Sequence, residues 1–291
     1  MTKNAKDIEA KDKFDVVIGN PPYQGNTKNN EVTGASAIWH RFVELSFDIC
    51  KEDGYICLVH PCGWRGCGAF SKIGKNIKSK KILYLEIHNM DDGIKTFGAS
   101  TRYDWYILQN NNNFCKTVIK DQEGKIYNAK INHLPIIPNM LIKNVISLMA
   151  RDGDERVEVL HSFSNYFSRK LSNEKSIEYK HPCIKYISKN DKKIDLYWSS
   201  YNDVGNFLVP KVMFCIDSAS GGGIVIDKEG KYLLSQFVAG IVDSDKNLKN
   251  IKKAIESDKF RKIMKACQYT KGLYNHKIIS LFRKDFWKDF I

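Results

Sequence analysis

Three features that define large classes of protein are missing from this chain of 291 residues. No apolar run approaches the roughly 20 residues that a membrane-spanning helix needs, which argues against an integral membrane protein. The opening stretch, MTKNAKDIEAKDK, has no apolar core of the kind that a secretory signal carries, so we expect a protein of the cytoplasm or of the compartment that holds its nucleic acid. None of the eight cysteines forms a Cys-x2-Cys pair. We therefore predict reduced cysteines and no metal site.

Acidic residues are in the minority. The chain has 46 Lys and Arg against 33 Asp and Glu, a formal net charge of +13. This excess favours a polyanionic partner, because each phosphate that a cation neutralises releases condensed counterions. A lysine-rich, solvated surface is the alternative, since the lysines are spread along the whole chain. The 43% of hydrophobic residues is typical of globular proteins, and the length suffices for two domains with cores of their own.

Strand and helix patterns alternate over the first part of the chain. The apolar run FDVVIG (14–19) is typical of a strand buried on both faces. Helical spacing follows over 36–51, and strand-like runs cover 55–60, 81–87 and 103–109. These patterns predict an α/β fold with a mostly parallel sheet. Since a strand buried on both faces belongs inside a sheet and no strand pattern precedes FDVVIG, we expect a partial Rossmann-like sheet whose first strands are missing.

The pattern changes at HLPIIPNM, where we place the boundary between domains 1–134 and 135–291. Much of the second domain is polar and irregular in pattern. Strand-like runs at 207–217 and 222–243, the latter containing a D-K-E-G hairpin turn, predict an α+β domain. Ser257 is the expected N-cap of a helix near the C-terminus.

The residues after FDVVIG combine rigidity with hydrogen-bond acceptors. The side-chain oxygen of Asn20 and the carbonyl of Pro21 are two acceptors suited to hold an exocyclic amine such as N6 of adenine, and Pro22 stiffens the backbone. Tyr23 offers a ring on which a base can stack. A base reaches such a pocket only after rotation out of the duplex. The alternative is a structural turn, because Asn and Pro are common turn residues.

Asn-Pro-Pro-Tyr directly after DVVIG resembles the catalytic motif of the DNA N6-adenine methyltransferases, in the form found in restriction–modification methylases. The segment AIWHRFVELSFDICKEDGYICLVHPCGW (37–64) is similar to the helix and strand that follow the motif in that family. IKTFGASTRYDWYILQN (94–110) resembles a later hairpin. The resemblance implies that Phe97 packs beside the flipped base; a core aromatic is the alternative. The C-terminal part is similar to the family's target-recognition region.

This resemblance implies a site-specific DNA adenine-N6 methyltransferase of a restriction–modification type, with S-adenosyl-L-methionine as cofactor and double-stranded DNA as partner. In the family an N-terminal segment with a Gly-rich turn and an acidic residue binds the cofactor. The residues before Phe14 contain no glycine, so the cofactor-binding residues are unknown. A separate polypeptide that supplies this half, a fragment or decayed gene, and an unconventional cofactor site are the open explanations.

Two other functions remain as alternatives. One is a non-catalytic DNA-binding or specificity protein, or a fragment, derived from such a methylase. The other is methylation of RNA or of protein glutamine, which the large basic C-terminal region disfavours.

The second domain interleaves cations and aromatics, as a surface that contacts DNA does. The candidate DNA-contacting residues are Arg169, Lys170, Lys185, Tyr186 and Trp198. A solvated lysine-rich surface is the alternative interpretation.

Overall fold

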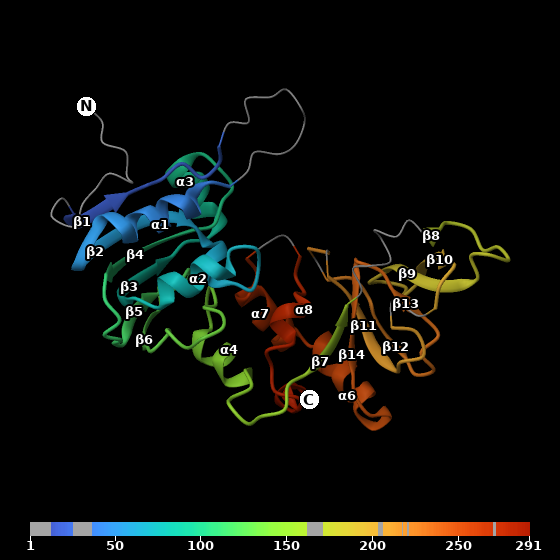
Figure 1. Cartoon of the computed structure of the whole chain (residues 1–291). Helices are drawn as coiled ribbons and strands as arrows, with labels where there is room; N and C mark the ends of the chain where they lie inside the picture. Colours follow the sequence, from blue (N-terminus) through green and yellow to red (C-terminus); the bar gives the residue numbers. More distant parts are fainter. Residues whose placement is uncertain are drawn as a thin grey trace. The chain divides into compact units, whose positions relative to one another are not determined.

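The computed structural model describes residues 13–25, 37–161, 171–202, 206–216, 218–219, 221–269 and 272–291 (Figure 1). The chain divides into two compact units, Met1–Ile142 and Lys143–Ile291, which we call the N-terminal and C-terminal units. Within the described ranges, every helix is too short or too polar to cross a membrane.

The N-terminal unit is built on one six-stranded sheet in the order β1-β2-β4-β3-β5-β6. Its strands are β1 (Phe14–Gly19), β2 (Cys50–Pro61), β3 (Lys81–Ile87), β4 (Tyr103–Gln109), β5 (Thr117–Lys120) and β6 (Ile126–Ala129). The α/β fold class is confirmed, but the expectation of a mostly parallel sheet is wrong. Only the pairs β1–β2 and β3–β5 are parallel, and β4 lies between β2 and β3, antiparallel to both. Hydrophobic periodicity marks a strand but not its direction.

Short helices flank this sheet: α1 (Trp39–Ile49), α2 (Ser71–Lys78) and α3 (Met90–Phe97). Trp39 at the start of α1 stacks on His60 of β2 with ring centroids 4.6 Å apart. The α3 helix begins with a reciprocal capping box between Asn89 and Asp92 and ends at Gly98, which has a φ of 67°. These end signals fix the position of Phe97, the last residue of α3.

Arg65 ties the end of β2 to the segment that leaves the unit. The side chain is fully buried, and its Nε donates to Asp104 Oδ2 of β4 at 2.7 Å. Its two terminal nitrogens donate to the carbonyl of Ile137 at 2.8 Å and to Asn139 Oδ1 at 2.9 Å. Trp64 Nε1 donates to the same Asp104 oxygen at 2.9 Å. A buried guanidinium is tolerated here because its donors are matched by several acceptors.

The C-terminal unit contains two four-stranded sheets, in the orders β13-β9-β10-β8 and β12-β11-β14-β7. Their strands are β7 (Glu158–His161), β8 (Leu171–Ser172), β9 (His181–Ile187), β10 (Ile194–Ser199), β11 (Lys211–Cys215), β12 (Ile224–Asp227), β13 (Leu233–Leu234) and β14 (Val238–Val242). The expected hairpin at D-K-E-G is wrong. The strand after that turn, β13, pairs in parallel with β9 of the other sheet instead of returning along β12. Local turn composition does not determine which strand becomes the partner.

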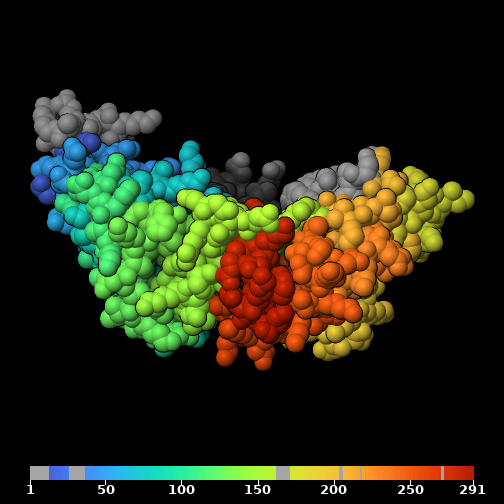
Figure 2. Space-filling model, turned by 90° about the horizontal axis from the view of Figure 1, so that it is seen from below, coloured from blue at the N-terminus to red at the C-terminus, as the bar shows by residue number. Residues whose placement is uncertain are grey.

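Helices complete the C-terminal unit: α4 (Ile142–Leu148), α6 (Asp245–Glu256), α7 (Asp258–Ala266) and α8 (His276–Ile279). The predicted cap is confirmed, because the Ser257 side chain accepts from the backbone N–H of Phe260. Phe260 also contacts the ring of Phe286, with centroids 5.6 Å apart. The closing residues, red in Figure 2, lie against the orange surface of the same unit. Helices and two mainly antiparallel sheets, with β13–β9 as the parallel pair, confirm the predicted α+β class for this part of the chain.

Candidate active site

The two predicted amine acceptors lie immediately beyond the C-terminal end of β1. Asn20 and Pro22 are exposed, whereas Pro21 is buried. No described donor bonds to the Asn20 side chain or to the Pro21 carbonyl. The exposed Asn20 side chain is therefore open to an outside donor, and the Pro21 carbonyl follows it on a backbone that two prolines restrict.

Tyr23 holds this turn against the start of α1. Its carbonyl accepts from the backbone N–H of Ile38 at 3.1 Å, and Gln24 forms an isolated antiparallel bridge with Ala37. The turn is thus fixed by backbone bonds on the side that faces the helix. The Asn20–Tyr23 segment is a defined strand-end loop, as the sequence predicted.

The Tyr23 ring contacts the Phe97 ring from α3. Their centroids lie 6.0 Å apart with an interplanar angle of 70°, and Phe97 makes a similar edge contact with Tyr103 at 4.9 Å. The Tyr23 hydroxyl is buried without a described hydrogen-bond partner. Burial, with smaller contributions from Tyr103 and Asp104, raises the pKa of Tyr23 to about 12. The structure therefore brings Phe97 to the predicted motif, although Phe97 lies 77 positions after Asn20 in the sequence.

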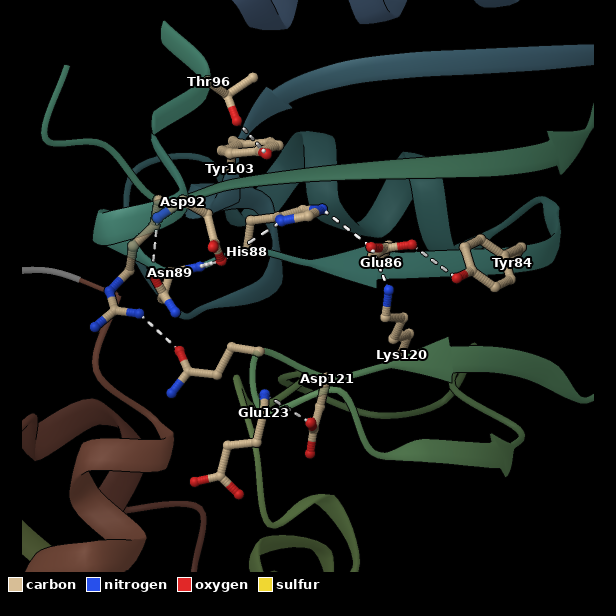
Figure 3. Close-up of polar contacts among 12 residues, drawn as sticks. Tyr84, Glu86, His88, Asn89, Asp92, Thr96, Tyr103, Lys120, Asp121 and Glu123 are labelled. Atoms are coloured by element: carbon tan, nitrogen blue, oxygen red, sulfur yellow. Dashed lines mark hydrogen bonds and ion pairs between the residues drawn. The ribbon is translucent and has the colours of Figure 1, made fainter. Parts of the chain in front are cut away.

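A polar network continues from this aromatic cluster along β3 (Figure 3). His88 stacks on Tyr103 with centroids 4.3 Å apart, and its two ring nitrogens lie 3.4 Å from Glu86 Oε1 and 3.6 Å from Asp92 Oδ2. Lys120 Nζ donates to the same Glu86 oxygen at 3.0 Å. The stacked His88 thereby restrains Tyr103, which in turn contacts Phe97.

Sequence reasoning missed His88 and Tyr103 as neighbours of the candidate site. Tyr103 also hydrogen-bonds to Thr96 of α3, with the two hydroxyl oxygens 3.1 Å apart. One signal was available: Tyr103 starts a strand directly after the segment that contains Phe97. The first side chain of a strand contacts the helix before it only when the connecting segment folds back, as the segment between Phe97 and Tyr103 does here.

Three of the five candidate DNA-contacting residues lie on the hairpin formed by β9 and β10. Lys185 and Tyr186 are both exposed, because the register shifts opposite Leu196 and Lys185 has no directly paired residue. Such a β-bulge turns consecutive side chains toward the same side. Trp198 is half-buried on β10 and has the Lys175 ammonium 5.1 Å from its ring centroid.

The remaining two candidates, Arg169 and Lys170, lie outside the described residues. The described ranges contain no group of three or more His, Cys, Asp or Glu arranged to hold a metal ion. The N-terminal unit also has a cavity of about 730 Å³ between α2 and residues 130–135. None of its lining residues comes from the Asn20–Tyr23 turn, so the cavity is separate from the motif.

Residues 1–97 match the family model of the Eco57I restriction-modification methylase. An uncharacterized adenine-specific methylase of Mycoplasma pneumoniae is 43% identical over 53 residues, which are 18% of this chain and 12% of that protein. The chain thus spans about an eighth of the length of this curated relative.

A solved structure of a restriction–modification enzyme has a similar fold. The type IIL restriction-modification enzyme MmeI, solved in complex with DNA, aligns with 91% of this chain and 45% of its own, at a TM-score of 0.52 and 8% identity. The type IIG restriction endonuclease BpuSI aligns with 99% of this chain and 50% of its own, at a TM-score of 0.38 and 10% identity. The resemblance noted in the motif is confirmed: the N-terminal unit is similar to the restriction–modification methylases of the Eco57I family.

Proposed function

We propose that the chain is the base-holding and target-recognition part of a site-specific DNA adenine-N6 methyltransferase of a restriction–modification type. S-adenosyl-L-methionine is the methyl donor that this family assignment implies. One observation carries the proposal: two acceptors at Asn20 and Pro21, to which no described donor bonds, adjoin the Tyr23 and Phe97 rings at the end of β1. The adenine-specific methylase of Mycoplasma pneumoniae supports the choice of base.

Each of the four residues of the turn has a separate role in holding adenine. Asn20 Oδ1 and the Pro21 carbonyl accept the two hydrogens of the exocyclic amine, which favours a tetrahedral nitrogen whose lone pair leaves the ring. Pro22 keeps both acceptors in place, so little reorganisation accompanies the reaction. Both acceptors are uncharged, so neither has to lose a proton before it accepts a hydrogen bond from the amine.

Tyr23 and Phe97 receive the base itself. Their centroids are 6.0 Å apart, less than the about 7 Å that a base between two parallel rings would need, which is twice the contact distance between carbon atoms. The base therefore stacks on one face of Tyr23 while Phe97 contacts it from the side. Stacking on an aromatic side chain is worth about 1–3 kcal/mol per base.

The described residues do not fit S-adenosyl-L-methionine as a complete pocket. The glycines that follow β2 are the nearest counterpart to a Gly-rich turn, but a Cβ at Gly63 would lie 2.9 Å from the Phe70 ring. At Gly63 the turn is therefore filled by its own aromatic side chain. We therefore derive only what Asn20, Pro21, Pro22 and Tyr23 do to the base, and no step through the cofactor.

Double-stranded DNA is the proposed partner, and the β9–β10 hairpin is the proposed contact. Lys185 and Tyr186 are exposed by the bulge, and Trp198 adds an aromatic surface beside Lys175. Arg169 and Lys170, which precede this hairpin in the sequence, are proposed as further DNA contacts. Cations of this kind contact phosphates, while aromatic side chains pack against sugars and bases. The protein then works in the compartment that holds this DNA.

A methylation assay with paired Tyr23 variants tests the proposal. The chain is incubated with S-adenosyl-L-methionine and unmethylated genomic DNA, and N6-methyladenine is measured by mass spectrometry. Tyr23→Ala should lower the rate by about 5- to 150-fold, because one stacking interaction is lost. Tyr23→Phe is the matched control and should retain activity, since the hydroxyl has no described partner.

Asn20→Ala in the same assay removes one amine acceptor and should lower the rate by about 100-fold or more. Activity unchanged in Asn20→Ala would show that this side chain does not hold the amine.

The second candidate is a non-catalytic DNA-binding or specificity protein, favoured by the lack of a complete cofactor pocket among the described residues. Methylation assays together with calorimetry with S-adenosyl-L-methionine separate the two. Micromolar affinity would exclude the second candidate, whereas DNA binding without methylation under every condition would exclude the first.

A further inference from the structure

The cavity of about 730 Å³ in the N-terminal unit is formed by two parts of the chain that hydrogen bonds hold together. We call this space between α2 and residues 130–135 the lysine cavity. Asn132 Nδ2 donates to the carbonyls of Lys78 at 2.6 Å and of Lys80 at 3.0 Å, which fixes the segment at the end of α2. The cavity is therefore formed without a ligand, and its volume lies within the range of about 300–1,000 Å³ typical of small-molecule sites.

The charges that line the lysine cavity are all of one sign. Lys75, Lys78 and Lys130 line it, and none of the described lining residues is Asp or Glu. A concave surface with charges of one sign concentrates the electric field and attracts counter-ions. Lys75 and Lys130 are exposed, and by themselves they would be ordinary surface lysines. The cavity becomes a candidate anion site because of the third lysine.

Lys78 differs from the other two lysines because it is buried. It is 6% exposed, and its Nζ donates to the carbonyls of Leu134 at 2.5 Å and Pro135 at 3.3 Å. An ammonium has three donors, and no described residue accepts from the third. Burial lowers the pKa of Lys78, with a smaller decrease from the nearby Lys75. Buried ammonium groups are normally paired with an anion, so a bound anion would supply the missing partner.

Aromatic and apolar side chains form much of the remaining wall. Trp64 and Leu134 are buried, and the Trp64 ring is held in place because its Nε1 donates to Asp104 Oδ2 at 2.9 Å. Phe114 also lines the cavity and is 57% exposed, so it lies where solvent reaches the space. Ordered aromatic side chains offer surfaces on which a flat ring packs. A ligand with an aromatic body therefore fits better than a bare ion.

The lining distinguishes between several anionic and cationic ligands. S-adenosyl-L-methionine carries a positive sulfonium, which three ammonium groups repel. A backbone phosphate of duplex DNA lies between two sugars on a convex surface, and it cannot approach an ammonium that is 6% exposed. A carboxylate carries a single charge, whereas a phosphate monoester carries about 1.5 to 2 negative charges at neutral pH. The phosphate monoester matches the three lysines best.

We propose that the lysine cavity binds a small phosphate monoester with an aromatic body, such as a nucleoside monophosphate. The phosphate accepts hydrogen bonds from Lys78 and Lys75, and the aromatic body packs against Trp64. None of the lining residues belongs to the Asn20–Tyr23 turn. This second site therefore goes beyond the proposed methylation and does not depend on it.

Inosine monophosphate is the probe, because its base has no exocyclic amine for the Asn20–Tyr23 turn to hold. Calorimetry on the full chain measures its affinity, and inosine and inorganic phosphate serve as its separate halves. We expect one site per chain with a Kd below about 1 mM, and weaker binding of either half. In nuclear magnetic resonance spectra, the amide signals that move on binding should be those of α2 and residues 130–135.

Lys75→Met is the informative variant, because an exposed lysine is replaceable without loss of folding. It should weaken the binding of inosine monophosphate by about 10-fold or more, as the loss of a hydrogen bond to a charged group does. Lys130→Met should also weaken binding. Lys72→Met is the matched control, since Lys72 is exposed on the same helix but does not line the cavity, and it should bind as the unchanged chain does.

Three results would overturn the lysine-cavity proposal. One is no binding of inosine monophosphate at about 1 mM. Another is equal binding by Lys75→Met and the unchanged chain, or equal losses in Lys75→Met and Lys72→Met. The third is binding that Tyr23→Ala abolishes, which would place the ligand at the base-holding turn.

A duplex oligonucleotide without terminal phosphates tests DNA as the source of the phosphate. If the duplex binds, Lys75→Met weakens that binding and inosine monophosphate does not bind, the lysines contact the DNA backbone and the proposal is wrong. The proposed methylation fails independently, because a chain that binds inosine monophosphate but never methylates DNA refutes that function and leaves the lysine cavity intact.

Discussion

Acidification should destabilise the N-terminal unit through one residue, His60. The side chain is fully buried, and desolvation lowers its pKa from 6.5 to about 4, with the nearby Arg65 adding to the decrease. Nδ1 lies 3.1 Å from the carbonyl of Pro61, which can only accept, so this nitrogen carries the proton in the neutral ring. Nε2 then accepts from the Tyr106 hydroxyl at 3.1 Å.

The sign and size of this effect on the free energy of unfolding follow from the linkage between proton binding and folding. The unfolded chain binds a proton at His60 below pH 6.5 while the folded chain does not until about pH 4, so the stability contribution is present above 6.5 and lost as the pH falls toward 4. A separation of about 2.5 pKa units corresponds to about 3 kcal/mol, of which about 2 kcal/mol is already lost at pH 5.

Urea unfolding of the unchanged chain and of His60→Gln, at pH 7 and at pH 5, measures this loss. Other groups titrate too, so the informative quantity is the difference between the two pH dependences of the unfolding free energy. That difference should be about 2 kcal/mol, and the His60 ring should titrate near pH 4 in nuclear magnetic resonance spectra. A ring that titrates near 6.5, or equal pH dependences for both proteins, would refute the reasoning.

Two further perturbations concern single buried contacts. Lys211→Met leaves the buried Asp227 carboxylate without its ammonium partner, now 3.0 Å away, and should cost about 3–5 kcal/mol in urea unfolding of the C-terminal unit; the exposed Lys231→Met is the control and should leave the midpoint unchanged. Gly93→Ala introduces a Cβ that overlaps the carbonyl oxygen of Thr101, so it should displace α3 and lower the thermal midpoint of the N-terminal unit by several degrees, and an unchanged midpoint would contradict the packing described.

Elements with strong local patterns were predictable from the sequence. The runs 81–87 and 103–109 coincide with β3 and β4, and Ser257 caps α7 as expected. In each case the pattern itself, alternating apolar residues or a capping hydroxyl, is the physical cause of the structure. The strand-end position of Asn20 was predictable for the same reason.

Long-range pairing was not predictable from these patterns. The hairpin of β9 and β10 lies in a polar stretch of sequence. Exposed residues such as Lys185 and Tyr186 occupy strand positions there, and a polar stretch of this kind is typical of a surface loop. The contact of Phe97 with Tyr23 depends on how α3 folds back on the sheet, and the antiparallel direction of β4 depends on its two neighbours. Neither is encoded in the spacing of nearby residues.

The exposed apolar side chains of β1 have a consequence for how much of this protein a cell can safely make. An apolar strand at the edge of a sheet is a template for edge-to-edge association. At high concentration the chain is therefore expected to aggregate or to be degraded.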